Sequence, residues 1–180
     1  MKIISRLFVI AVVTAFFSGS AGAEPKNGLG LSAGLASHNR DCGACTGPST
    51  AGLSIGLDYQ FSLSSQFSFN PFLMSSSETV KNVSGTKAGH GILGAQLRYW
   101  AGDMFIGGHV GSYSEVFITS GTTVSTASGL GAGLVVGWEQ PDGGVFIMGQ
   151  LDSATVTPSS PLYSDVNFSA FRLSAGYRWK

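Results

Sequence analysis

Residues 130–139 have the sequence Leu-Gly-Ala-Gly-Leu-Val-Val-Gly-Trp-Glu, in which apolar side chains recur at every second position. The apolar series is Leu130, Ala132, Leu134, Val136 and Trp138, and the series between them is Gly131, Gly133, Val135, Gly137 and Glu139. Successive side chains of a β-strand point to opposite faces, whereas a helix repeats every 3.6 residues. This stretch therefore predicts a strand with one apolar face and one face of mostly small or polar residues.

The same period of two returns along the rest of the chain. Four further blocks are regular: 28–36, 52–61, 92–99 and 171–179. Three blocks are less regular, namely 67–74, 105–113 and 145–152. Pro71 weakens the first of these three, because proline cannot donate a hydrogen bond to a neighbouring strand. Together the blocks predict eight strands.

The connections between the blocks alternate in length. Short turns are predicted at Ser62–Gln66, Ala101–Asp103 and Gln140–Gly144. Longer polar loops are predicted at His38–Thr50, Ser75–Lys87, Val116–Ser128 and Ser153–Asp165. Short turns on the periplasmic side and longer loops outside are typical of bacterial outer-membrane barrels. The pattern predicts an all-β fold, an eight-stranded antiparallel up-and-down transmembrane β-barrel.

The N-terminal residues predict export from the cytoplasm. Lys2 and Arg6 flank the start of an apolar run over 7–17, and Ala21-Gly22-Ala23 follows. This arrangement is typical of a secretory signal peptide with its cleavage site, and the run is too short for a membrane-spanning helix. We therefore expect a signal peptide over 1–23, a barrel domain over 24–180, and insertion into the outer membrane from the periplasm.

Composition separates this barrel from soluble alternatives. Only 11% of the residues are charged, where about 25% is usual, and the 10 basic residues equal the 10 acidic ones. That balance excludes a basic nucleic-acid-binding protein. A soluble lipid-carrying barrel would need a charged outer face, and Gly and Ser on the second face make a poor coat against water. Small side chains instead suit the crowded lumen of an eight-stranded barrel.

Several charged residues share that inner face by parity. They are Asp58, Arg98, Glu139, Asp152, Arg172 and Arg178, with His109 among them. Because an unpaired charge in the lumen would be costly, we expect these groups to pair with one another and to serve as structural contacts.

Aromatic residues cluster near the short turns. We predict a periplasmic aromatic girdle at the membrane interface, formed by Tyr59, Trp100, Trp138, Tyr177 and Trp179. Such rings prefer the level of the lipid headgroups, whereas the core of a soluble sandwich would spread them along its strands.

The C-terminal residues Ser174-Ala175-Gly176-Tyr177-Arg178-Trp179-Lys180 alternate aromatic with other side chains. This stretch resembles the terminal assembly signal of outer-membrane barrels, except that Lys180 follows the final aromatic. With the strand count, the chain resembles the small barrels typified by outer membrane protein X and the membrane domain of outer membrane protein A. The resemblance implies a monomer with outer-membrane lipids as partners, barrel-assembly machinery during insertion and an extracellular ligand, in an adhesion, resistance or structural role.

Cys42 and Cys45 stand in the first predicted loop. A redox-active pair would need a helix start that is lacking here. A loop disulfide is favoured in an oxidising compartment. Free thiols, or a metal site with His38 and Asp41, are the alternatives, although structural zinc needs four well-spaced ligands. We predict no metal site.

Enzymatic activity is not expected either. A lipid A-modifying acyl hydrolase or transferase is the alternative, and a small-solute pore is a third possibility. His109 is the candidate base, but Ser112 lies on the opposite face and Glu115 is about 20 Å along the strand. No cofactor motif is present, because the glycines follow strand parity instead of opening a helix.

Overall fold

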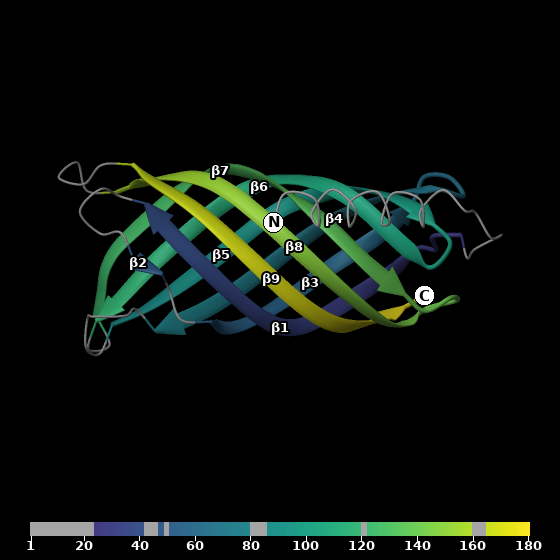
Figure 1. Cartoon of the computed structure of the whole chain (residues 1–180), viewed down its shortest axis with the longest axis horizontal. Coiled ribbons are helices and arrows are strands. Elements are labelled where there is room, and N and C mark those ends of the chain that lie inside the picture. Colours follow the sequence, from purple (N-terminus) through teal and green to yellow (C-terminus); the bar gives the residue numbers. More distant parts are fainter. Residues whose placement is uncertain (1–23, 42–46, 49–50, 80–85, 120–121, 160–164) are drawn as a thin grey trace, which may run out of the picture.

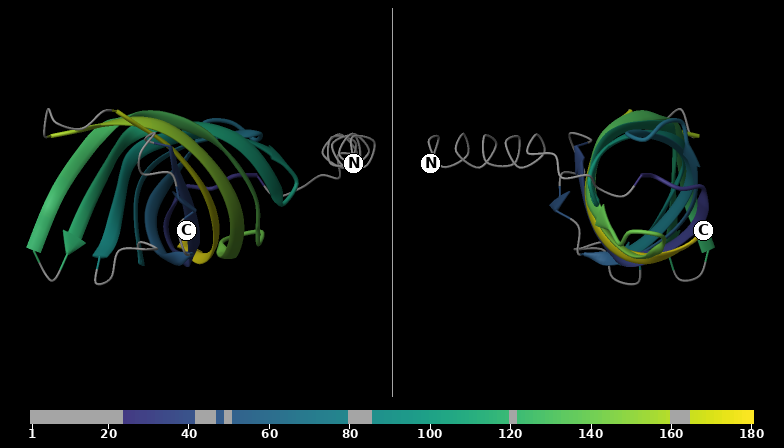
Figure 2. Two further views of the ribbon diagram at one scale, coloured as in Figure 1. Left: turned by 60° about the vertical axis from the view of Figure 1, so that its left-hand side comes forward. Right: turned by 90° about the vertical axis from the view of Figure 1, so that its right-hand side faces the viewer.

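Eight long antiparallel strands close into a barrel (Figures 1 and 2). The computed structural model describes residues 24–41, 47–48, 51–79, 86–119, 122–159 and 165–180. The barrel strands are β1 (Gly28–Asp41), β3 (Gly52–Ser62), β4 (Phe67–Thr79), β5 (Thr86–Ala101), β6 (Met104–Thr119), β7 (Thr122–Glu139), β8 (Gly144–Pro158) and β9 (Val166–Trp179). Each pairs with its neighbour in sequence, and β1 pairs with β9 to close the ring. The predicted fold class is confirmed.

Three short turns and the C-terminus gather at one end of the barrel, which we call the turn end (Figure 1). Gly102 and Gly143 have positive φ angles of 66° and 92° in two of these turns, a conformation that glycine adopts without steric cost. In the turn that contains Gly143, Asp142 accepts a hydrogen bond from Lys26. That contact lowers the pKa of the exposed Asp142 carboxyl. The opposite end, which carries the other four connections, is the loop end.

The strands run further toward the loop end than the sequence predicted. β6 ends at Thr119 and β7 begins at Thr122, so strand pairing occupies most of the predicted Val116–Ser128 loop. β1 likewise extends to Asp41, and β8 to Pro158. In the first connection the two residues of β2 (Gly47–Pro48) pair with Asn39 and Arg40. The sequence analysis therefore overestimated the lengths of the four long loops. Strand ends rich in Ser and Thr lack the alternation of apolar and polar residues by which the strands were predicted.

Pro71 lies inside β4, where it leaves a gap on one side only. Pairing with β3 lapses between the partners Asp58↔Phe72 and Phe61↔Phe69. On the other side Pro71 faces Ala95 in an unbroken ladder with β5. A residue without an N–H is tolerated where the ladder is already interrupted.

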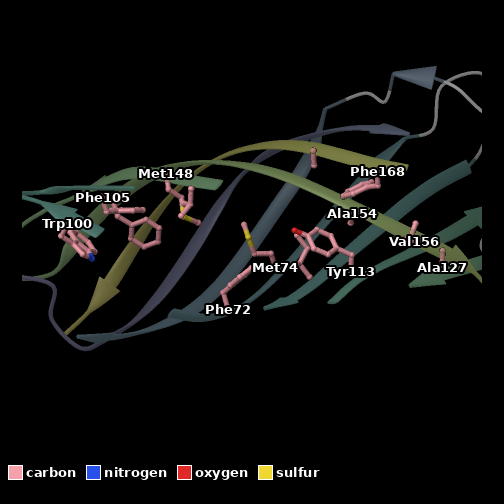
Figure 3. Close-up of a cluster of buried hydrophobic side chains, with 14 residues drawn as sticks. Phe72, Met74, Trp100, Phe105, Tyr113, Ala127, Met148, Ala154, Val156 and Phe168 are labelled. Carbon is pink, nitrogen blue, oxygen red and sulfur yellow. The ribbon is translucent and has the colours of Figure 1, made fainter. Parts of the chain in front are cut away.

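Buried apolar side chains line the lumen between its polar groups. Figure 3 shows them distributed along the barrel, with Trp100, Phe105 and Met148 toward one end and Ala127 and Val156 toward the other. A cavity of about 10 Å³ lies beside Asp58 and Arg98, about the size of one water molecule. Among the described residues, these side chains and the polar groups between them fill much of the interior.

The prediction of the aromatic girdle is wrong for one residue, Trp100. Trp100 is buried in the lumen, where its indole Nε1 donates to Ser68 Oγ at 2.9 Å and its ring contacts Phe105. Because Tyr99 takes the outward position, the next residue must face inward. The other four predicted girdle residues, Tyr59, Trp138, Tyr177 and Trp179, face outward.

Candidate functional site in the barrel lumen

The polar residues of the lumen form three clusters, one above another from the turn end to the loop end. The turn-end cluster comprises Asp58, Arg98, Glu139, Arg178 and Lys180. The central cluster comprises His109, Tyr113, Gln150, Asp152 and Arg172. The loop-end cluster comprises His38, Arg40, Ser76, Glu78, His90 and Glu115.

Arg178 is the centre of the turn-end cluster. Its Nη2 lies 2.9 Å from Asp58 Oδ2, and its Nε donates to Glu139 Oε2 at 3.0 Å. Arg98 lies 3.7 Å from the same Asp58 oxygen, and Lys180 Nζ lies 3.1 Å from Glu139 Oε1. All six predicted lumen charges are thus inside the barrel. Four of them, Asp58, Arg98, Glu139 and Arg178, join β3, β5, β7 and β9 in this cluster, and Asp152 and Arg172 belong to the central cluster.

The central cluster is built around Asp152. His109 Nε2 and the Tyr113 hydroxyl each lie 2.8 Å from Asp152 Oδ1, and Arg172 pairs with Oδ2. His109 and Asp152 stand on β6 and β8 with Gly133 of β7 between them. A Cβ at Gly133 would lie 2.4 Å from the His109 ring, so the absence of a side chain lets the two groups meet.

The loop-end cluster shares one guanidinium between two buried carboxylates. Arg40 Nη2 donates to Glu78 Oε1 at 2.5 Å, and Arg40 Nε donates to Glu115 Oε1. Arg40 Nη2 also lies 2.9 Å from His90 Nε2. The second oxygen of Glu115, Oε2, is buried and has no hydrogen-bond partner among the described residues.

Two stacked histidines stand beside this carboxylate pair. The rings of His38 and His90 are 3.9 Å apart between centroids, and both stack on Phe168. His38 Nδ1 lies 2.9 Å from Glu78 Oε2, and His90 Nε2 lies 3.4 Å from Glu78 Oε1. Ligand atoms of His38, Glu78 and His90 all fall within 4.8 Å of one another, which makes them the candidate metal-binding group of the described residues.

The loop-end cluster also contains an arrangement like that of a hydrolase. In space, the order Ser76, His38, Glu78 resembles that of a nucleophile, its base and the carboxylate that orients the base. Ser76 Oγ lies 3.2 Å from His38 Nε2, and Glu78 holds Nδ1 on the other side of the ring. Arg172 Nη2 lies 3.4 Å from the same Nε2. The sequence-based candidates do not form such an arrangement, since Ser112 faces outward and His109 contacts Asp152.

Sequence reasoning missed the loop-end cluster because it ended the strands too early. His38, Ser76 and Glu78 fell in predicted loops, where no face could be assigned to them. Extending the period of two by a few residues would have placed all three on the inner face beside His90. The candidate disulfide of Cys42 and Cys45 and the signal peptide over 1–23 lie outside the described residues.

No family model matches the chain, and no curated protein matches it by sequence. Among solved structures, the chain is similar to Ail, the attachment invasion locus protein of Yersinia pestis, with 15% identity and a TM-score of 0.56 over 86% of this chain and 99% of that one. It is also similar to Neisserial surface protein A, with 16% identity and a TM-score of 0.58 over 84% of this chain and 96% of that one.

At these identities the likeness concerns the fold. Both comparisons span nearly the whole of the matched chain, and the barrel described above closes with the same number of strands. The chain therefore has the fold of the small eight-stranded outer-membrane β-barrels.

Proposed function

We propose that the chain is an integral protein of the bacterial outer membrane that displays its loop end at the cell surface. The observation that carries this proposal is the apolar outer wall. Leu31, Leu97 and Leu134 expose 50%, 52% and 62% of their surface, and each of the eight barrel strands contributes such residues. A contiguous apolar belt of this kind is unsuited to water and suited to lipid.

The proposed role is structural or adhesive, through a ligand bound outside the cell, and it requires neither transport nor catalysis. Among the described residues, ion pairs stand at the turn end, in the centre and at the loop end of the lumen, which argues against a water-filled path for small solutes. Ail and Neisserial surface protein A bear names that refer to attachment, invasion and the cell surface. These names support a surface role, which rests here on likeness of fold alone.

We also propose which end of the barrel faces the periplasm. The two ends of the described barrel domain lie at the turn end (Figure 1), which we place in the periplasm, on the side from which a secreted chain meets the assembly machinery. We propose removal of residues 1–23 before insertion as a monomer. No helix among the described residues is long and apolar enough to cross a membrane.

Epitope insertion tests this orientation. An epitope between residues 120 and 121 should be labelled by antibody on intact cells, whereas the same epitope between Asp142 and Gly143 should be labelled only after the outer membrane is permeabilised. Labelling of the second insertion on intact cells would place the turn end outside. In planar bilayers the protein should give no steady conductance, and large stable steps would contradict the filled lumen.

A second candidate function is acyl-ester hydrolysis, favoured by the order Ser76, His38 and Glu78. In such a site the serine attacks the ester carbonyl while the histidine takes its proton. The guanidinium of Arg172 beside His38 Nε2 opposes this role, because it disfavours the imidazolium that must form. A fluorophosphonate probe decides between the two: labelling lost in Ser76→Ala but kept in Ser54→Ala would establish a hydrolase.

A further inference from the structure

Ligand atoms of His38, Glu78 and His90 all lie within 4.8 Å of one another, close enough to surround a single metal ion. Zinc binds histidine nitrogen and carboxylate oxygen at about 2.0–2.1 Å, so two tetrahedral ligands lie about 3.3 Å apart. Here His38 Nδ1 is 2.9 Å from one Glu78 oxygen and His90 Nε2 is 3.4 Å from the other. The ligands come from β1, β4 and β5, which the barrel holds in fixed register.

The nitrogen of each ring that faces away from this point also has a polar neighbour. His90 Nδ1 lies 3.8 Å from Glu115 Oε1, and His38 Nε2 lies 3.2 Å from Ser76 Oγ. Metal-bound histidines usually direct the other ring nitrogen to a carboxylate, carbonyl or water, which fixes the tautomer and the ring orientation. The loop-end cluster therefore contains both the ligands and the groups that would orient them.

A cationic side chain contacts two of these ligand atoms. Arg40 Nη2 contacts both Glu78 Oε1, at 2.5 Å, and His90 Nε2, at 2.9 Å. Because a guanidinium has only donors, the contact requires a free lone pair on His90 Nε2, which is the atom that binds a metal. This tautomer leaves the proton on Nδ1, toward Glu115.

Glu115 supplies an independent observation. It is 2% exposed and its Oε2 has no hydrogen-bond partner among the described residues. An unpartnered buried carboxylate oxygen is costly, and the guanidinium that serves Glu115, that of Arg40, also serves Glu78. If Arg40 turned fully toward Glu115, it would satisfy that carboxylate and vacate the position between Glu78 and His90.

We propose that the loop-end cluster binds one divalent transition-metal ion of the zinc type. His38 Nδ1, His90 Nε2 and the Glu78 carboxylate are its ligands, Ser76 and Glu115 orient the two rings, and Arg40 is the cation that the metal displaces. Two imidazoles with a carboxylate favour zinc, copper or nickel over magnesium and calcium, which prefer oxygen ligands. This inference goes beyond the surface role proposed above and revises the prediction that no metal site exists.

The test is calorimetric titration of the tag-free protein, extracted from the outer membrane into detergent, with ZnCl₂. A Cys42→Ser/Cys45→Ser background removes the only thiols of the chain, which could bind zinc by themselves. We expect one zinc per chain and no comparable binding of MgCl₂. Absence of zinc binding, or equally tight binding of magnesium, would overturn the proposal.

Substitutions within the cluster should change the affinity for zinc in opposite directions. Glu78→Gln and His90→Gln should each weaken binding by about 10-fold or more, whereas Arg40→Met should strengthen it by removing the competing cation. His109→Gln, a lumen histidine outside the cluster, is the matched control and should leave the affinity unchanged. Heat-modifiable migration identifies the variants that fold. Because Glu78→Gln and His90→Gln each remove one ligand, either of them can test the site if the other fails to fold.

The direction in which Arg40→Met changes the zinc affinity is decisive. Unchanged affinity in both Glu78→Gln and His90→Gln, or weaker binding in Arg40→Met, would show that zinc binds elsewhere. Because none of these measurements involves cell-surface display, they can fail while the proposed surface role holds.

Discussion

Arg178 on β9 reaches Asp58 on β3 across the backbone of Gly30. Gly30 of β1 is the registered partner of both residues, and the ion pair above it measures 2.9 Å between Nη2 and Oδ2. A Cβ at Gly30 would lie 2.4 Å from Asp58 Oδ1 and 3.0 Å from Arg178 Nη1. Gly133 separates His109 from Asp152 in the same way. In this lumen, glycine is placed where polar groups two strands apart must meet.

Gly30→Ala should therefore destabilise the barrel. The added methyl group displaces the ion pair within a filled interior, and overpacking of this kind costs about 1–3 kcal/mol. The measurement is the free energy of unfolding in urea, with the protein in detergent or lipid. Gly149→Ala is the control, because the nearest atom to its Cβ would lie 3.9 Å away; equal losses from the two substitutions would contradict this account.

Arg178→Ala should have a larger effect. It leaves Asp58 and Glu139 buried without their common partner, and breaking a buried ion pair costs about 3–5 kcal/mol. Lys180→Ala removes a more peripheral partner of Glu139 and should cost clearly less. Urea unfolding of both variants checks the difference. A smaller loss from Arg178→Ala than from Lys180→Ala would show that the turn-end cluster is not organised around Arg178.

The three tryptophans should respond differently to brominated lipids. Trp138 and Trp179 face outward, with 39% and 53% of their surface exposed, whereas Trp100 is 5% exposed in the lumen. In variants that keep one tryptophan each, with the others changed to Phe, bromine should quench Trp138 and Trp179 strongly and Trp100 weakly. Strong quenching of Trp100 would return it to the outer girdle.

The sequence was sufficient to predict the face of the barrel on which a residue lies, but not its contact partner. Parity placed Asp58, Glu139 and Arg178 inside, because a period of two needs only a strand. Their meeting depends on the stagger between strands that are not neighbours, which no local pattern encodes. Trp100 was misassigned although parity was informative. Because Tyr99 faces outward, parity places the Trp100 side chain in the lumen, and only the nearness of Trp100 to a turn suggested the girdle.

The loop-end cluster was hidden for a different reason. Its members lie where the outward residues change from apolar to polar, so the alternation that defines a strand fades although the backbone pairing continues. The histidines and carboxylates consequently fell in predicted loops or seemed isolated. Strand ends in a barrel are fixed by pairing with both neighbours, a long-range contribution that sequence periodicity does not contain.

The central claim is a closed barrel with a lipid-facing wall, and the migration of the unboiled protein tests it most directly. Protein extracted from the outer-membrane fraction should migrate at a different apparent mass in SDS gels before and after boiling, because the paired strands resist detergent until heated. Recovery as a soluble periplasmic protein, with a single migration unaffected by heating, would contradict the account.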